Sequence, residues 1–272
     1  MATTLMRTHR LLFRLALTIV SRVLIVRDNL LDAFARGPHA AEHGVRVMRL
    51  VIDSAPSVLD AVYVEPENAT AALLLCHGIG ETVEHWMGVQ QILARSGVAS
   101  LVFDYSGYGK STGAIHWEQL ERDAVAAFGA MRNLAPQLPA SVLGFSLGSG
   151  VAAAAMGRIP ADSLILCEAF TSFRAAAQAA GVPKALAPLV PPIWDAEESL
   201  RGCTVPVLIV HGERDRLFPV AMARELEAIC GERAELVLVP GMAHNQPFRR
   251  PEICYWGPIA RWLGSGHSAQ HG

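Results

Sequence analysis

The sequence lacks any C-x-x-C pair, and its five cysteines are odd in number and widely spaced. Neither a zinc knuckle nor a disulfide framework is therefore expected, and the predicted compartment is a reducing one, the cytoplasm. The formal net charge is only −2, which excludes a nucleic-acid-binding protein driven by bulk charge. With 51% hydrophobic residues and 18% charged ones, the chain has ample apolar surface to bury in a folded core.

Acidic residues are absent from residues 1–27, a stretch that carries five arginines. Its longest uncharged apolar run, Leu15–Ser21, is far shorter than the ~18 residues that a membrane-spanning helix needs. At about 100° per residue the arginines gather on one arc, and this predicts a basic amphipathic helix over residues 5–26 within an N-terminal unit, residues 1–36. Such a helix either lies on the inner face of a membrane or packs on the catalytic domain.

Short apolar runs alternate with helical patterns from residue 45 onward. This alternation predicts a doubly wound α/β fold with a mostly parallel central sheet, in which the strands are buried on both faces. Strands are expected at residues 45–52, 58–64, 71–76, 99–104, 141–145, 163–167, 205–210 and 234–239, and helices near residues 84–96, 116–133, 147–158, 218–230 and 253–263.

The rhythm breaks between residues 169 and 204, where four prolines surround an alanine-rich helical stretch. We expect this segment to be a small cap inserted between two strands of one domain that covers residues 37–272. Its apolar side chains would then lie over the carboxyl ends of the strands, where ligands bind in such sheets.

The strongest motif is Gly144-Phe145-Ser146-Leu147-Gly148, which fits G-x-S-x-G. It follows a predicted strand and precedes a predicted helix, and the sharp turn between them needs small residues beside an exposed serine hydroxyl. A serine nucleophile also needs a base and an orienting acid. Asp215 and His244 each follow a later predicted strand, so the chain order is Ser146, Asp215, His244. Glu168 ends another strand and is the competing acid.

These motifs, together with His77-Gly78-Ile79-Gly80, resemble those of a serine hydrolase of the α/β-hydrolase superfamily over about residues 45–263. The run from Asp104 to Gly109 is similar to a branch of ester and thioester hydrolases that includes protein depalmitoylases. The resemblance implies an oxyanion hole formed by the backbone N–H groups of Ile79 and Leu147. Plausible substrate-pocket residues are Trp86, Met87, Trp194 and Phe218.

The expected function is hydrolysis of a carboxylic ester of a short to medium apolar acyl group through an acyl-enzyme. No metal and no organic cofactor is expected, and the partner is a small-molecule acyl ester or thioester. Three enzymatic alternatives stay open: a thioesterase of the depalmitoylase kind, acyl transfer to an acceptor other than water, and amide cleavage. The non-enzymatic alternative is a hydrolase-shaped binding protein.

Two further patterns resemble known functional motifs, and in each case we interpret the match as a coincidence. Gly109-Lys110-Ser111 resembles the end of a phosphate-binding loop, but Asp104 stands where the leading glycine would be. His39-Ala40-Ala41-Glu42-His43 fits a zinc-binding pattern, yet Gly37-Pro38 and Gly44 leave little room for the helix that it needs.

Overall fold

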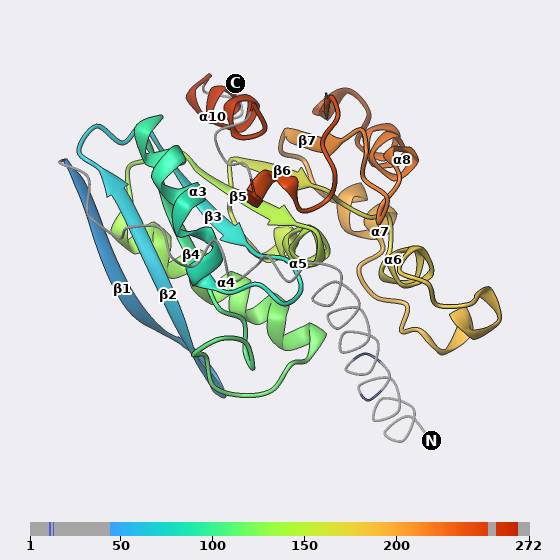
Figure 1. Ribbon diagram of the computed structural model, residues 1–272. Helices are drawn as coiled ribbons and strands as arrows, with labels where there is room; N and C mark the ends of the chain where they lie inside the picture. Colours follow the sequence, from blue (N-terminus) through green and yellow to red (C-terminus); the bar gives the residue numbers. More distant parts are fainter. Residues whose placement is uncertain (1–10, 12, 14–43, 250–253, 266–272) are drawn as a thin grey trace.

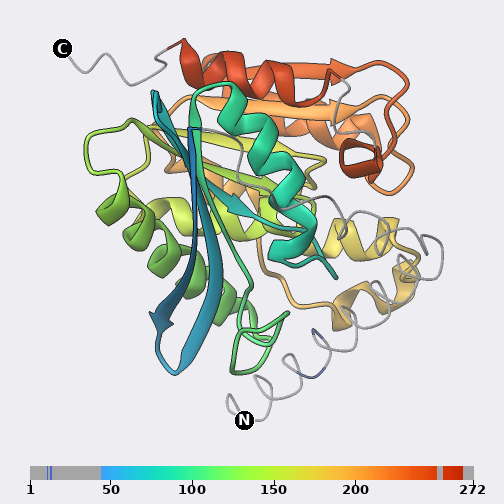
Figure 2. The ribbon, with the colours of Figure 1, turned by 60° about the vertical axis from the view of Figure 1, so that its left-hand side comes forward.

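The computed structural model describes Leu11, Phe13 and residues 44–249 and 254–265. Within these residues the chain forms an eight-stranded sheet in the order β1-β2-β4-β3-β5-β6-β7-β8 (Figures 1 and 2). Strands β1, β2 and β4 pair antiparallel, and every pairing from β4 to β8 is parallel. The bounds are β1 (Val45–Ser54), β2 (Ser57–Pro66), β3 (Ala71–Cys76), β4 (Val98–Phe103), β5 (Ala140–Phe145), β6 (Ser163–Cys167), β7 (Val207–Gly212) and β8 (Ala234–Val239).

Helices cover both faces of this sheet, as the alternation of apolar runs and helical patterns predicts. Figure 2 shows α3 and α10 on one face and α4 on the other. The described helices are α3 (Val83–Arg95), α4 (Trp117–Leu134), α5 (Leu147–Ala155), α6 (Phe173–Ala179), α7 (Ala196–Arg201), α8 (Val220–Cys230), α9 (Gln246–Arg249) and α10 (Trp256–Gly264), with short 3₁₀ turns η1 (Met156–Arg158), η2 (Lys184–Leu189) and η3 (Gly231–Arg233).

Each central strand contributes side chains to two separate cores because successive residues of a strand point to opposite faces. In β3, Leu74 packs in the core under α4 and α5, whereas Leu73 and Leu75 pack under α3 and α10. All six residues of β3, β4 and β5 are buried. Burial on both faces explains why these strands are continuous apolar runs in the sequence.

The segment between β6 and β7, where the insertion at residues 169–204 is predicted, holds three short helical elements, α6, η2 and α7. In Figure 1 it lies beyond α5, on the side of the molecule away from β1 and β2. Trp194 sits here with a positive φ of 50°, and its indole Nε1 donates a hydrogen bond to Glu121 of α4 at 3.0 Å. This bond ties the insertion to the helix layer of the main domain.

Most of the predicted helix over residues 5–26 lies outside the described residues, as do His39, His43, His267 and His271. Phe13 is described, and its side chain is fully buried. Its ring contacts the rings of Trp117, Phe173 and Trp194 at centroid distances of 5.5, 5.1 and 5.6 Å. At this one position the N-terminal unit packs against α4 and the insertion.

We predict that Phe13→Ala lowers the free energy of unfolding by about 3–5 kcal/mol, because it removes a buried aromatic ring from an aromatic cluster. The matched control is Leu11→Ala, since Leu11 is 68% exposed and its truncation is expected to cost less than about 0.5 kcal/mol. Urea unfolding followed by circular dichroism measures both values. Equal effects of the two substitutions would contradict the packing of Phe13.

Candidate active site

Ser146 lies in the turn between β5 and α5, with φ 51° and ψ −116°. At Gly144 and Gly148, the positions on either side of this turn, there is no room for a Cβ atom. A Cβ atom on Gly144 would collide with the carbonyl oxygen of Gly148, and one on Gly148 would collide with the carbonyl oxygen of Cys76. The backbone N–H of Ser146 donates to the carbonyl of Cys167 at 2.9 Å, so β6 holds the turn from the other side.

His244 and Asp215 form a continuous hydrogen-bonded line with this serine. Nε2 of His244 lies 2.9 Å from Oγ of Ser146, and Nδ1 lies 2.7 Å from Oδ2 of Asp215. The three side chains come from loops after β5, β7 and β8, and all three are buried. The fold therefore brings together groups that are 98 and 29 residues apart in sequence.

The second oxygen of Asp215 is fixed by the backbone. Oδ1 accepts hydrogen bonds from the N–H groups of Leu217 and Phe218 at 2.7 and 2.9 Å. Burial opposes ionisation of this carboxyl group, but the hydrogen bond and charge of His244 outweigh burial and lower the pKa of Asp215 to about 2. The group is therefore a carboxylate at neutral pH, able to hold the Nδ1–H tautomer of His244.

Glu168, the competing acid, lies beside Asp215 with its side chain fully buried and a positive φ of 45°. Its Oε1 accepts from the backbone N–H of Gly212 at 2.9 Å. Burial, followed by the charge of Asp215, raises the pKa of Glu168 to about 10. The two acids thus differ in state at neutral pH, since Asp215 is ionised and Glu168 holds a proton.

His211, at the end of β7, is a packed histidine. Its side chain is fully buried, and Nε2 donates to the carbonyl of Phe218 at 2.8 Å. Burial lowers the pKa of His211, so the ring is neutral although Asp215 lies 3.5 Å away. Asp104 also has a structural role, because its carboxylate accepts from the backbone N–H groups of Val83 and Lys110.

The two predicted oxyanion donors stand at neighbouring chain turns. Gly148 packs so closely on β3 that a Cβ there would meet the carbonyls of Cys76 and His77, which brings the start of α5 to the loop holding Ile79. In the described part of the chain, the backbone N–H groups of Ile79 and Leu147 donate to no protein acceptor. Unpaired N–H groups at a helix start are available to an anion.

The four predicted pocket residues lie in different surroundings. Phe218 is close to the reacting groups, since its ring centroid is 5.1 Å from that of His244. Trp86 is fully buried among Phe145, Phe248 and Trp256 on the α3 side of the sheet. Trp194 belongs to the aromatic cluster around Phe13. Met87 of α3 is partly buried. That these side chains line an acyl pocket stays a prediction.

Phe170, one of the apolar residues of the predicted cap, packs edge-on against Phe218 at 5.4 Å. Two other buried side chains near the site were not singled out from the sequence. Phe248 packs against Phe145 at 4.7 Å. Glu81 is a buried carboxyl group in the loop that contains Ile79. The sequence did hold a signal for Glu81, because it is an acidic residue directly after the His-Gly-Ile-Gly run.

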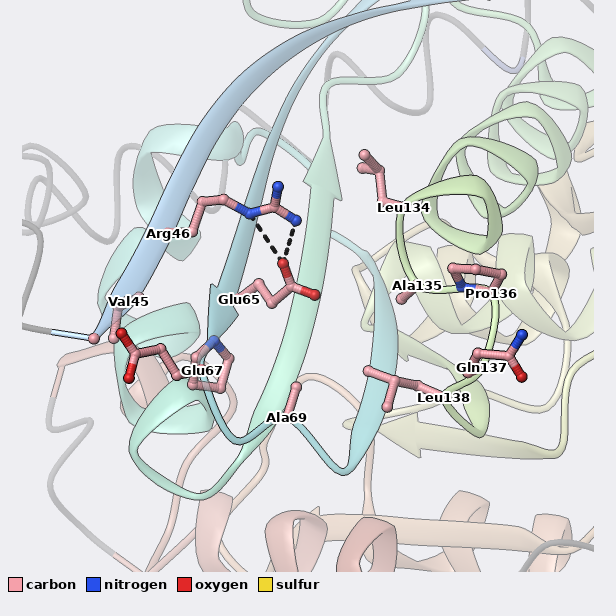
Figure 3. A pocket seen from close by; sticks show the side chains of 12 residues that line it. Val45, Arg46, Glu65, Glu67, Ala69, Leu134, Ala135, Pro136, Gln137 and Leu138 are labelled. Atoms are coloured by element: carbon pink, nitrogen blue, oxygen red, sulfur yellow. Dashed lines mark hydrogen bonds and ion pairs between the residues drawn. The ribbon is translucent and has the colours of Figure 1, made fainter.

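A separate concavity lies at the opposite end of the sheet (Figure 3). It is bordered by the Arg46–Glu65 ion pair and by Leu134–Leu138, the turn that leads into β5. Ser146 follows β5, whereas Leu138 precedes it, so this concavity is not part of the site around the serine.

Comparison with known proteins agrees with this architecture. The family model for serine aminopeptidase, S33, matches residues 67–196, which include Ile79 and Ser146. The chain is 30% identical over 199 residues to the uncharacterized protein YfhR of Salmonella typhimurium, covering 67% of each. It is 26% identical over 261 residues to the monoacylglycerol lipase of Mycolicibacterium smegmatis, covering 77% of this chain and 90% of that one.

Other relatives are longer than the matched region. The lysophosphatidylserine lipase ABHD12 of Macaca fascicularis is 27% identical over 216 residues, which are 68% of this chain and 54% of that protein. The chain spans 63% of an uncharacterized Mycobacterium tuberculosis protein and 58% of the human protein ABHD12B.

Solved structures show the same fold at lower identity. An α/β hydrolase from Vibrio vulnificus superposes with a TM-score of 0.69 at 20% identity, covering 90% of this chain and 93% of that one. The architecture is that of an α/β hydrolase, as the sequence predicts. The chain belongs to the α/β-hydrolase superfamily, and lipases are among its more distant relatives.

Asp215→Asn is predicted to lower kcat for p-nitrophenyl butyrate by about 10⁴-fold, because an amide cannot hold the required tautomer of His244. Glu168→Gln replaces a protonated acid with a neutral amide. It is expected to lower kcat by less than about tenfold, which corresponds to the loss of one hydrogen bond. Steady-state kinetics of both variants rank the acids. The reverse ranking would assign the orienting role to Glu168.

The proton on Glu168 also predicts a pH-dependent difference in stability. An unfolded glutamate loses its proton near pH 4.3, whereas the folded one keeps it to about pH 10, so rising pH favours the unfolded chain. Between pH 5 and 9 the unfolding free energy of the wild type should therefore fall relative to that of Glu168→Gln, by at most about 1.4 kcal/mol per pH unit. Urea unfolding across this range measures the difference, and a constant difference would show that Glu168 is ionised in the fold.

Proposed function

We propose that this chain is a serine esterase that hydrolyses carboxylic esters through an acyl-enzyme. The observation that carries the proposal is the line of hydrogen bonds from Ser146 through His244 to Asp215, built at the carboxyl ends of three parallel strands. This geometry suits a hydroxyl nucleophile, a general base and an orienting carboxylate. The lipases among its relatives support the same reaction type.

In the proposed reaction, His244 takes the proton of Ser146 as Oγ attacks the ester carbonyl. Asp215 holds the imidazole and stabilises its protonated form. The N–H groups of Ile79 and Leu147 bind the tetrahedral oxyanion, and each such donor contributes ~3 kcal/mol of barrier lowering by analogy with other hydrolases. His244 then protonates the leaving alcohol. Water, activated by the same histidine, releases the acid from Ser146.

The proposed substrate is an ester with a single apolar acyl chain of short to medium length. Phe218 beside His244, and Phe170 packed against Phe218, provide apolar surface next to the reacting groups. Its relatives include a monoacylglycerol lipase and a lysophosphatidylserine lipase, and both names refer to lipids that carry one acyl chain. A thioester or an acyl acceptor other than water would use the same groups, and product analysis with thioesters and added alcohols separates these alternatives.

The location of the protein stays a prediction: cytoplasmic, with residues 5–26 either on a membrane surface or packed on the domain. Among the described residues, none of the helices is long and apolar enough to cross a membrane. The burial of Phe13 supports packing on the domain at that position.

Ser146→Ala and His244→Ala are each predicted to lower kcat for p-nitrophenyl butyrate by about 10⁴–10⁶-fold, and the double variant should lose no more than either single one. The residues act as one unit, so their losses do not add. Steady-state rates of the three variants test this expectation. The control is Ser149→Ala, three residues along α5, whose hydroxyl donates to the carbonyl of Ser146. Losses that add, or Ser146→Ala with near-normal turnover, would reject the mechanism.

A further inference from the structure

The loop between β3 and α3 contains a buried carboxyl group that the proposed reaction does not use. Glu81 is 5% exposed. Its Oε2 accepts two hydrogen bonds, from the backbone N–H of Gly78 at 2.7 Å and from Nε1 of Trp86 at 2.9 Å. One oxygen atom therefore joins the start of the loop to the first turns of α3.

These bonds enclose the peptide unit of Ile79. The N–H of Gly78 is taken by Glu81, and the N–H of Glu81 points back to the carbonyl of Gly78 at 3.4 Å. Gly80 has a positive φ of 76°, which turns the chain between them. The packing is tight, because a Cβ on Gly78 would lie 2.9 Å from Oε1 of Glu81. Of the N–H groups from Gly78 to Glu81, those of Ile79 and Gly80 have no acceptor in the described part of the chain.

The surroundings of Glu81 make the restraint independent of its protonation state. Burial raises the pKa of Glu81 to about 7, against the opposing effects of Gly78, Trp86 and the nearby His244. Tyr105 and Tyr108, from the segment after β4, also face it, and burial raises the pKa of both phenols so that they are neutral. A carboxylate and a carboxylic acid both retain an oxygen acceptor, so either form can hold Gly78 and Trp86.

We propose that Glu81 is a positioning residue that holds the N–H of Ile79 in place for the oxyanion by binding Gly78 and Trp86 through one oxygen. This role rests on the proposed esterase function. In this role Glu81 acts through the loop, since its side-chain hydrogen bonds run to Gly78 and Trp86 and not to Ser146. Because the oxyanion forms only as the ester is attacked, a displaced donor should lower kcat and leave KM nearly unchanged.

The test compares substitutions that differ in the acceptor. Glu81→Met keeps the side-chain length and removes the acceptor, and Glu81→Ala is a second variant if the first unfolds. Glu81→Gln keeps a carbonyl oxygen for both donors and removes the charge. The matched control is Glu84→Gln in the first turn of α3, where Glu84 is partly exposed and pairs with Arg49 and Lys110.

We expect Glu81→Met to lower kcat for p-nitrophenyl butyrate on the order of 10²-fold with KM changed less than about threefold. Glu81→Gln should lower kcat by no more than about five- to tenfold, which corresponds to one weakened hydrogen bond. Wild-type kinetics in Glu81→Met would overturn the proposal. So would Glu81→Gln as slow as Glu81→Met, because the charge and not the hydrogen bonds would then matter.

Amide hydrogen exchange tests the loop without any substrate. Exchange in the peptide covering residues 77–82 should be faster in Glu81→Met than in the wild type, and unchanged in Glu81→Gln and Glu84→Gln. Equal exchange in Glu81→Met and the wild type would overturn the positioning role. If the wild type hydrolysed no ester, the proposed function would fail, and the exchange rates would still decide whether Glu81 holds the loop.

Discussion

The conformation of Ser146 is the constraint on which the rest of the site depends. A non-glycine residue with φ 51° is strained, and such strain persists only where the surroundings fix it. Here β6 holds the backbone N–H, while Gly144 and Gly148 allow β5, α5 and β3 to approach within a distance that no Cβ could occupy. The same close approach that forces the turn also brings the start of α5 to the loop of Ile79.

Around this turn, the balance between burial and hydrogen-bond partners sets the ionisation of the acidic groups. Asp215 has three hydrogen-bond partners, two backbone N–H groups and His244, and stays ionised. Glu168 has one backbone donor and a charged neighbour, and stays neutral. A single negative charge is therefore kept beside His244 in a buried site, where a second carboxylate would be costly.

The sequence predicted the fold because each central strand is apolar on both faces, and it proposed Ser146, Asp215 and His244 as catalytic residues because each follows a predicted strand. Side-chain surroundings were harder to foresee. Trp194 lies in the insertion between the strands that carry Ser146 and Asp215, yet its side chain turns toward Glu121 and Phe13. The role of Glu81 depends on two donors, Gly78 and Trp86, that converge only when the loop is folded. Local patterns do not encode such convergence.

The central claim is that the fold makes the hydroxyl of Ser146 a nucleophile. The most direct measurement is treatment of the folded protein with a fluorophosphonate, followed by intact mass and peptide mapping. The account predicts one adduct, on the peptide containing Ser146, and none in Ser146→Ala. No adduct on the folded wild type, or an adduct on another residue that persists in Ser146→Ala, would contradict it.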